Sequence, residues 1–236
     1  MRILLINYEY PPTGAGAANA TYHLARNLNA AGHTVAVLTA QFHGERGWSE
    51  HQGVWVFRCA ARHTRPNRSS IGEMLTFIAG AMLALRGVIT ELRPEACIAF
   101  FSIPCGPLAL LAKRCWGIPY VVSLRGGDVP GSEPGLTLMY RLLAALRRLI
   151  LRESRAVIAN SQGLKEMSER ADPIPVGVIA NGVDTDYFQP GPERGTGSPF
   201  RVLFVGRFQK QKNLLFLLEQ FAATVQGFQR SRFHST

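Results

Sequence analysis

Two glycine-containing segments place chemically useful residues directly after predicted strands. In the first, Gly14-Ala15-Gly16 stands between an apolar run and a helical pattern. The free N–H groups and the dipole at a helix amino terminus favour an anion, and glycine lets a phosphate or a sugar approach the backbone closely. The segment therefore predicts a ligand contact at Gly16, and a plain tight connection is the alternative interpretation.

The second segment, Arg125-Gly126-Gly127-Asp128, follows a predicted strand at its carboxyl end, where open α/β sheets bind their ligands. Arginine stays charged, so Arg125 can recognise an anion or a hydroxyl group but cannot act as a base. Asp128 can bind a sugar hydroxyl or cap the following turn. The sequence leaves both roles of Asp128 open.

A dinucleotide fingerprint is disfavoured at the first loop. Asn19 stands where GxGxxG needs its third glycine, and the predicted second strand ends at Gln41 without the acidic residue that holds a ribose. Both departures count against the rival hypothesis of a nicotinamide-dependent reductase.

The elements that position these segments alternate between short apolar runs and helical patterns. This order predicts an α/β fold built on a doubly wound parallel sheet. We expect strands at 2–7, 34–39, 54–59, 96–100, 120–124, 156–159 and 176–179, and helices at 17–31, 71–92, from about 104, at 136–153 and after 161. Beyond a linker at 190–199 the pattern restarts with a strand at 201–205 and a helix at 213–224.

Charge and apolar content limit the partners. Lys and Arg exceed Asp and Glu by 26 to 16, which favours anionic partners or reflects a general basic bias. No arginine-rich block with interleaved aromatics occurs, so we expect no nucleic acid. The cysteines lack metal-binding spacing. No signal-peptide core and no apolar run of about 20 residues is present, which predicts a cytoplasmic protein.

Residues 136–153 form a separate question. Arg141, Arg148 and Arg152 share one stripe of this predicted helix, and leucines cover most of the remainder. Such a helix is either buried against the sheet, which we favour, or lies peripherally on anionic lipid.

Four segments in register resemble glycosyltransferase family 4, whose members are retaining enzymes with two facing Rossmann-like lobes of the GT-B type. They are residues 10–16, 123–130, 178–184 and 203–212. The resemblance implies a Rossmann-like amino-terminal lobe and an incomplete second lobe. It also implies transfer of a sugar from a nucleotide-diphosphate-sugar donor to an acceptor hydroxyl in glycan or glycolipid biosynthesis.

The resemblance carries roles over to individual residues. Gly16 would lie near the donor phosphates and the acceptor, although Ala15 stands where the family usually has a further glycine. Arg125, Gly126 and Gly127 would contact the substrate, with Arg125 replacing a histidine that is common in the family. Asp128 is the candidate catalytic residue.

Two further pairs of residues follow from the same resemblance. Asn181 and Gly182 would form the hinge between the lobes. Arg207 and Lys212 would bind the donor diphosphate, since fixed cations stabilise the charge of a departing nucleoside diphosphate and can replace a metal. We therefore expect no metal and no cofactor besides the nucleotide-sugar substrate. A solvated basic loop is the alternative at these last two residues.

The expected organisation is an acceptor-side domain at 1–180, a hinge and linker at 181–199, the start of a donor-binding domain at 200–224 and a disordered or aberrant tail at 225–236. The family's later pair of glutamates lies beyond the sequence. We therefore expect a fragment or truncated product that binds a sugar or glycolipid acceptor but is inactive alone. A non-catalytic acceptor-binding or partner-binding module is the alternative, so the sequence leaves open whether the chain is an enzyme.

Overall fold

The computed structural model describes residues 1–61, 70–132, 137–191, 202–206 and 212–233, with side chains described up to 225. The chain divides into two compact units, Met1–Val183 and Asp184–Thr236. Each unit is described by itself.

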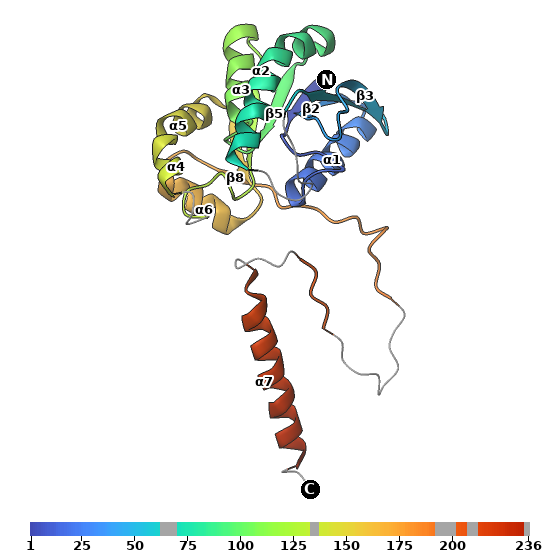
Figure 1. Ribbon diagram of the computed structural model, residues 1–236, viewed down its shortest axis with the longest axis vertical. Helices are drawn as coiled ribbons and strands as arrows, with labels where there is room; N and C mark the ends of the chain where they lie inside the picture. The colour runs from blue at the N-terminus through green and yellow to red at the C-terminus, as the bar shows by residue number, and fades with distance from the viewer. Residues whose placement is uncertain (62–69, 133–136, 192–201, 207–211, 234–236) are drawn as a thin grey trace. The chain divides into compact units, whose positions relative to one another are not determined.

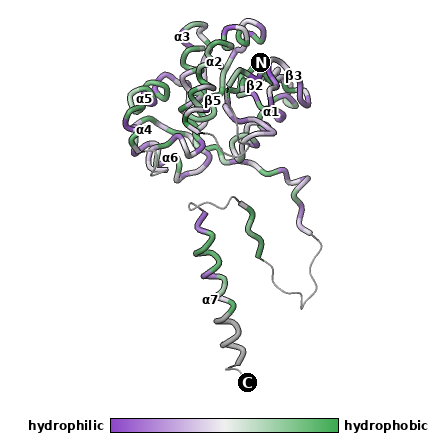
Figure 2. The backbone as a smooth tube through the Cα atoms, in the orientation of Figure 1, coloured by the Kyte–Doolittle hydropathy of each residue, from purple (hydrophilic) through white to green (hydrophobic). Residues whose placement is uncertain are grey.

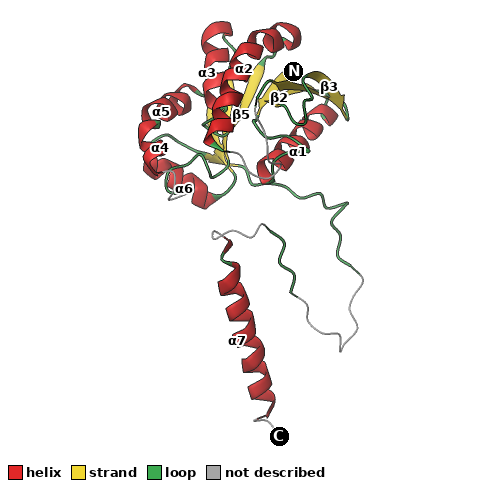
Figure 3. Cartoon of the chain, in the orientation of Figure 1, coloured by secondary structure: helices red, strands yellow, loops and turns green. Residues whose placement is uncertain are grey.

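A single sheet forms the centre of the first unit (Figure 3). Its strands lie in the order β3-β4-β2-β1-β5-β6-β7-β8, and every neighbouring pair is parallel except β3 with β4. This arrangement confirms the predicted α/β class. The strands are β1 (Arg2–Ile6), β2 (Thr34–Ala40), β3 (Gly47–His51), β4 (Val54–Cys59), β5 (Ala96–Phe100), β6 (Tyr120–Leu124), β7 (Ala156–Ala159) and β8 (Gly177–Val178).

Helices cover both faces of this sheet (Figure 1). Both α1 (Gly16–Ala30) and α2 (Ile71–Leu92) contact β2 and β4, and right-handed crossovers place them on opposite faces. The other helices of the unit are α3 (Gly106–Trp116), α4 (Thr137–Leu142), α5 (Ala144–Glu153) and α6 (Gln162–Ala171). The central strands are buried on both faces, which explains their continuous apolar sequences.

Strand β3 was not predicted from the sequence. Apart from Trp48, its side chains are polar, and the strand is partly exposed because it is an edge strand that pairs antiparallel with β4. The connecting turn contains Gln52 and Gly53, both with positive φ, 54° and 78°. A two-residue turn of this kind joins strands into a hairpin and supplies a local signal for the missing strand.

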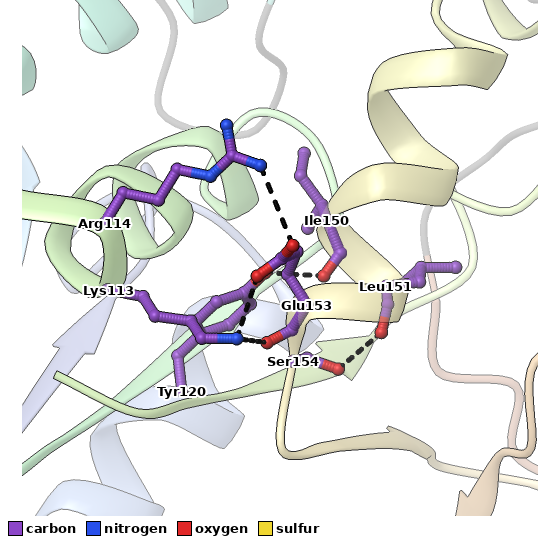
Figure 4. Close-up of polar contacts among 7 residues, drawn as sticks. All are labelled: Lys113, Arg114, Tyr120, Ile150, Leu151, Glu153 and Ser154. Carbon is purple, nitrogen blue, oxygen red and sulfur yellow. Dashed lines mark hydrogen bonds and ion pairs between the residues drawn. The ribbon is translucent and has the colours of Figure 1, made fainter. Parts of the chain in front are cut away.

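The predicted helix at 136–153 forms two helices, α4 and α5, joined at Leu143. Figure 4 shows how the end of α5 is attached to α3 and β6. Lys113 donates to the Glu153 carboxylate at 2.9 Å, and the Tyr120 hydroxyl donates to the Ile150 carbonyl at 2.6 Å. The hydrogen bond from Lys113 lowers the pKa of Glu153. These contacts fix one face of α5 against the sheet layer.

Helix α2 is long and apolar enough to cross a membrane by length and composition. In this fold it buries Phe77, Ala81, Leu85 and Val88 beneath its contacts with β2, β4 and α3. Because core helices of globular folds have the same composition, its hydropathy carries no membrane assignment here.

The second unit contains one described helix, α7 (Leu214–Phe233). The helix continues past the predicted end at 224 into the segment for which we expected a disordered tail. The predicted strand at 201–205 is not formed in its described part, because residues 202–205 have no strand partner. The described part of this unit exposes apolar side chains, among them those of Leu203, Val205, Leu215 and Phe216. Figure 2 shows the hydrophobic first turns of α7.

Candidate functional site

The strand order reverses between β1 and β5, and the loops that follow these two strands lie at the same edge of the sheet. Open α/β sheets bind their ligands at such a switch point. The ring of Tyr8 after β1 and the ring of Phe101 after β5 have centroids 5.3 Å apart. The two loops therefore meet at the edge where the sequence predicts the site.

Asn7, the residue directly after β1, fixes the loop that contains Gly14 and Gly16, called here the glycine loop. The side-chain amide of Asn7 donates to the Thr21 hydroxyl of α1 at 2.7 Å, and its oxygen accepts from the Glu9 amide at 3.2 Å. Gly14 has φ of 91°, and a Cβ there would lie 2.7 Å from that of Ala18. Only glycine suits this turn.

Gly16 begins α1 and is exposed, and a Cβ at this position would meet nothing within 4 Å. Ala15 precedes it as the N-cap residue and provides no side-chain hydrogen bond. A helix amino terminus offers backbone N–H groups to an anion or a sugar oxygen, and the exposed Gly16 lies at this end of α1. This geometry is compatible with the predicted contact at Gly16.

Arg125 lies over the ring of Phe100, 4.6 Å from its centroid, and its Nη1 donates to Oδ1 of Asn181 at 2.8 Å. Burial lowers the pKa of the guanidinium, which still keeps its charge. The structure thus joins a predicted substrate contact to a predicted hinge residue. Gly126, with φ of 108°, and the exposed Gly127 follow at the rim, and the exposed Gly182 follows Asn181.

Asp128 is buried, with 4% of its surface exposed. Its Oδ2 accepts from the Ser102 amide at 2.6 Å, and its Oδ1 accepts from the Arg125 amide at 3.0 Å. Burial raises the pKa of this carboxyl, while the hydrogen bonds from those two amides lower it. Each carboxylate oxygen accepts a backbone hydrogen bond, which is the turn-stabilising role that the sequence left open for Asp128.

The Ser102 contact has a further consequence for the loop after β5. Phe101 has φ of 72°, a left-handed conformation that is rare for a bulky residue. Asp128 accepts from the amide of Ser102, the residue after Phe101, and so holds this strained loop against the loop after β6. Asp128 is a positioning residue for two rims of the site.

Replacing Asp128 with asparagine should lower the free energy of unfolding by about 1–3 kcal/mol. The asparagine side chain has an NH₂ group in place of one carboxylate oxygen, so one of the two buried backbone N–H groups would face a donor and lose its acceptor. Urea denaturation followed by circular dichroism measures this change. Asp184→Asn is the matched control, since Asp184 accepts from the Asp186 and Tyr187 amides at 3.1 and 3.0 Å but is exposed. Equal midpoints for both variants would show that Asp128 does not hold the loops.

The two predicted donor-phosphate residues belong to the second unit, which is described by itself. Arg207 lies outside the described residues. Lys212 is exposed and belongs to the second unit. Among the described residues, no group of three or more His, Cys, Asp or Glu side chains is placed to hold a metal ion.

The mostly parallel sheet with its switch point and flanking helices matches the Rossmann-like lobe of GT-B structures in fold. A model of the glycosyl transferase 4-like domain matches residues 15–182, and the chain belongs to this family. The predicted family resemblance is confirmed.

Relatives and solved structures agree with this assignment. Glycogen synthase of Mycobacterium tuberculosis strain H37Rv is 27% identical over 91% of this chain and 56% of its own length. The chain thus spans about half the length of the curated relatives that it matches. Sucrose-phosphate synthase from Thermosynechococcus elongatus superposes with a TM-score of 0.66 at 15% identity, over 80% of this chain and 50% of that one.

A second solved structure shows the same fold. The catalytic domain of starch synthase IV from Arabidopsis thaliana, bound to ADP and acarbose, has a TM-score of 0.56 at 12% identity. The match covers 79% of this chain and 52% of that one. At these identities the likeness concerns the fold alone.

Proposed function

We propose that the first unit is the acceptor-binding lobe of a retaining glycosyltransferase, which moves a sugar from a nucleotide-diphosphate-sugar to an acceptor hydroxyl. The family match over residues 15–182, together with the exposed Gly16 at the amino terminus of α1, carries this proposal. The relatives named glycogen synthase make a glucan the first acceptor to test.

In the proposed reaction, Gly16 and the first amides of α1 receive substrate oxygens, and Arg125 donates to a hydroxyl or an anion at the opposite rim. Asp128 keeps the rims in place through the Ser102 and Arg125 amides. Arg207 and Lys212 would stabilise the departing nucleoside diphosphate by charge, without a metal.

We further propose that the 236-residue chain alone does not turn over. The described part of the second unit contains one helix and no strand. The whole chain spans just over half of the length of its curated relatives. A parallel sheet of a second Rossmann-like lobe needs several strands with helices on both faces. The same observation favours the alternative of a non-catalytic module that binds an acceptor or a partner.

Titration of maltotriose by ligand-observed NMR, together with an assay for nucleoside diphosphate release from UDP-glucose and ADP-glucose, tests both proposals. We expect maltotriose to bind without release of diphosphate. Gly16→Val should weaken binding at least about tenfold by filling the open space. Gly163→Val is the matched control, because Gly163 also lies in the first turn of a helix with nothing within 4 Å.

Each result has a separate meaning. Absent binding, or equal binding by the wild type and both variants, would contradict an acceptor site at Gly16. Release of diphosphate would contradict the proposed inactivity, and binding of NADH instead of maltotriose would favour the reductase hypothesis.

We also propose that the protein is cytoplasmic and touches anionic membranes through α4 and α5. Leu138, Leu142 and Leu146 are 71%, 74% and 37% exposed at a spacing of four residues. Arg141 of α4 and Arg152 of α5 are also exposed, whereas Arg148 pairs with Asp172. An apolar stripe beside arginines suits an interfacial helix.

Leu142→Glu should reduce sedimentation with phosphatidylcholine vesicles containing phosphatidylglycerol by about tenfold. It removes a leucine that would insert into the lipid and adds repulsion from the anionic headgroups. Leu83→Glu in α2 is the control, since Leu83 is 88% exposed but lies outside this stripe. Binding that is absent from the wild type, or unaffected by salt and by Leu142→Glu, would end the membrane proposal.

A further inference from the structure

Near the glycine loop, four buried side-chain atoms have no hydrogen-bond partner among the described residues. They are Oη of Tyr10, Oγ1 of Thr39, and Nε and Nη1 of Arg58. The residues are 1%, 0% and 7% exposed. Folded proteins pair nearly all buried polar groups, so a concentration of unpaired ones indicates a ligand position.

These atoms come from the carboxyl ends of β2 and β4 and from the loop after β1. Thr39 in β2 and Arg58 in β4 are register partners, so their side chains leave the same face of the sheet. Nη2 of Arg58 donates to the carbonyl of Pro11 at 2.8 Å, which places the guanidinium beside the loop after β1. Tyr10 directly precedes Pro11, and its ring lies 6.3 Å from that of Tyr22 in α1.

Two cations, Arg58 and Arg26, act on the Tyr10 hydroxyl in this cluster. Burial raises the pKa of Tyr10 to about 12, whereas the neighbouring cations Arg58 and Arg26 act to lower it. A guanidinium can only donate hydrogen bonds, and both hydroxyls can donate as well. A partner that supplies acceptors and negative charge suits a cluster that contains this guanidinium.

Glu45 already brings a carboxylate to the edge of this cluster. Its Oε2 lies 3.4 Å from Nε of Arg58, and its side chain is 73% exposed against 8% for Arg58. An exposed carboxylate loses little when it leaves such a contact for water. Glu45 is thus suited to occupy the anion position when no ligand is bound.

We propose that Arg58, Tyr10 and Thr39 form a subsite for a phosphate monoester on the acceptor, and that Glu45 stands in for this phosphate in the free protein. Donors from two strand ends and one loop suit the three oxygens of a phosphate better than the planar pair of a carboxylate. The inference rests on the proposed function, because Tyr10 and Pro11 belong to the loop that ends at Gly16.

Calorimetric titration with inorganic phosphate and with glucose 1-phosphate tests the subsite. Both should bind the wild type, Glu45→Gln should bind several-fold more tightly because its competitor is neutral, and Arg58→Gln should lose at least about tenfold in affinity. Arg86→Gln, an exposed arginine of α2, should bind like the wild type. Circular dichroism checks the fold of each variant.

The outcomes separate the subsite from the proposed function. Unchanged affinity in folded Arg58→Gln, or no gain in Glu45→Gln, overturns the subsite. If Arg58→Gln fails to fold, Tyr10→Phe takes its place and must weaken phosphate binding. If inorganic phosphate binds but glucose 1-phosphate does not, the assignment of the subsite to a phosphate on the acceptor is overturned. Maltotriose, which is neutral, is titrated in parallel, so its binding without phosphate binding overturns the subsite alone.

Discussion

Replacing Gly80 with alanine is expected to destabilise the fold by about 3 kcal/mol, at the upper end of the usual cost of overpacking. A Cβ at Gly80 would lie 1.8 Å from the carbonyl oxygen of Ala60, just after β4. Neither partner is a flexible side chain, so relief requires α2 to move away from the sheet. The free energy of unfolding from urea denaturation measures the loss.

Gly87→Ala in the same helix provides the control. Nothing lies within 4 Å of a Cβ at Gly87, so alanine there only removes the conformational freedom of glycine. This change should stabilise the protein by up to about 1 kcal/mol. Opposite signs for one substitution in one helix would isolate the close contact with Ala60. A Gly80→Ala protein as stable as the wild type would contradict that contact.

The central part of the fold was predictable because buried parallel strands have continuous apolar sequences. The predicted strands at 96–100, 120–124 and 156–159 coincide with β5, β6 and β7. Strand β3 was missed, since an exposed edge strand carries polar residues and its pairing depends on the neighbouring β4. The strand expected at 201–205 shows the opposite case, because apolar residues do not form a parallel strand without partners.

The site was predictable in position but not in its contacts. Glycines and strand ends located the loops at Gly16 and at 125–128, since both follow predicted strands. The partners of Asp128 and Arg125, namely Ser102 and Asn181, are 26 and 56 residues away in sequence. Such pairs depend on which loops the sheet brings together. The unpaired nitrogens of Arg58 likewise appear only once β2 and β4 are adjacent.

Asp172→Ala is expected to cost about 3–5 kcal/mol, which is typical of removing one partner from a buried ion pair. Asp172 caps α6 and is 1% exposed, and it pairs with Arg147 of α5, which is 3% exposed. Without the carboxylate, the buried guanidinium of Arg147 loses its counter-charge. Arg148, with 44% of its side chain exposed, remains solvated and loses less. The free energy of unfolding in urea gives the cost.

A double variant separates the stranded charge from the loss of the pair itself. Replacing both members by apolar residues, as in Arg147→Met with Asp172→Leu, should restore most of the stability, because a buried ion pair contributes little over well-packed apolar residues. Glu166→Ala, an exposed change in α6, should stay within about 0.5 kcal/mol of the wild type. If the double variant is as unstable as Asp172→Ala, the cost comes from lost hydrogen bonds between α5 and α6, and the stranded charge is not its cause.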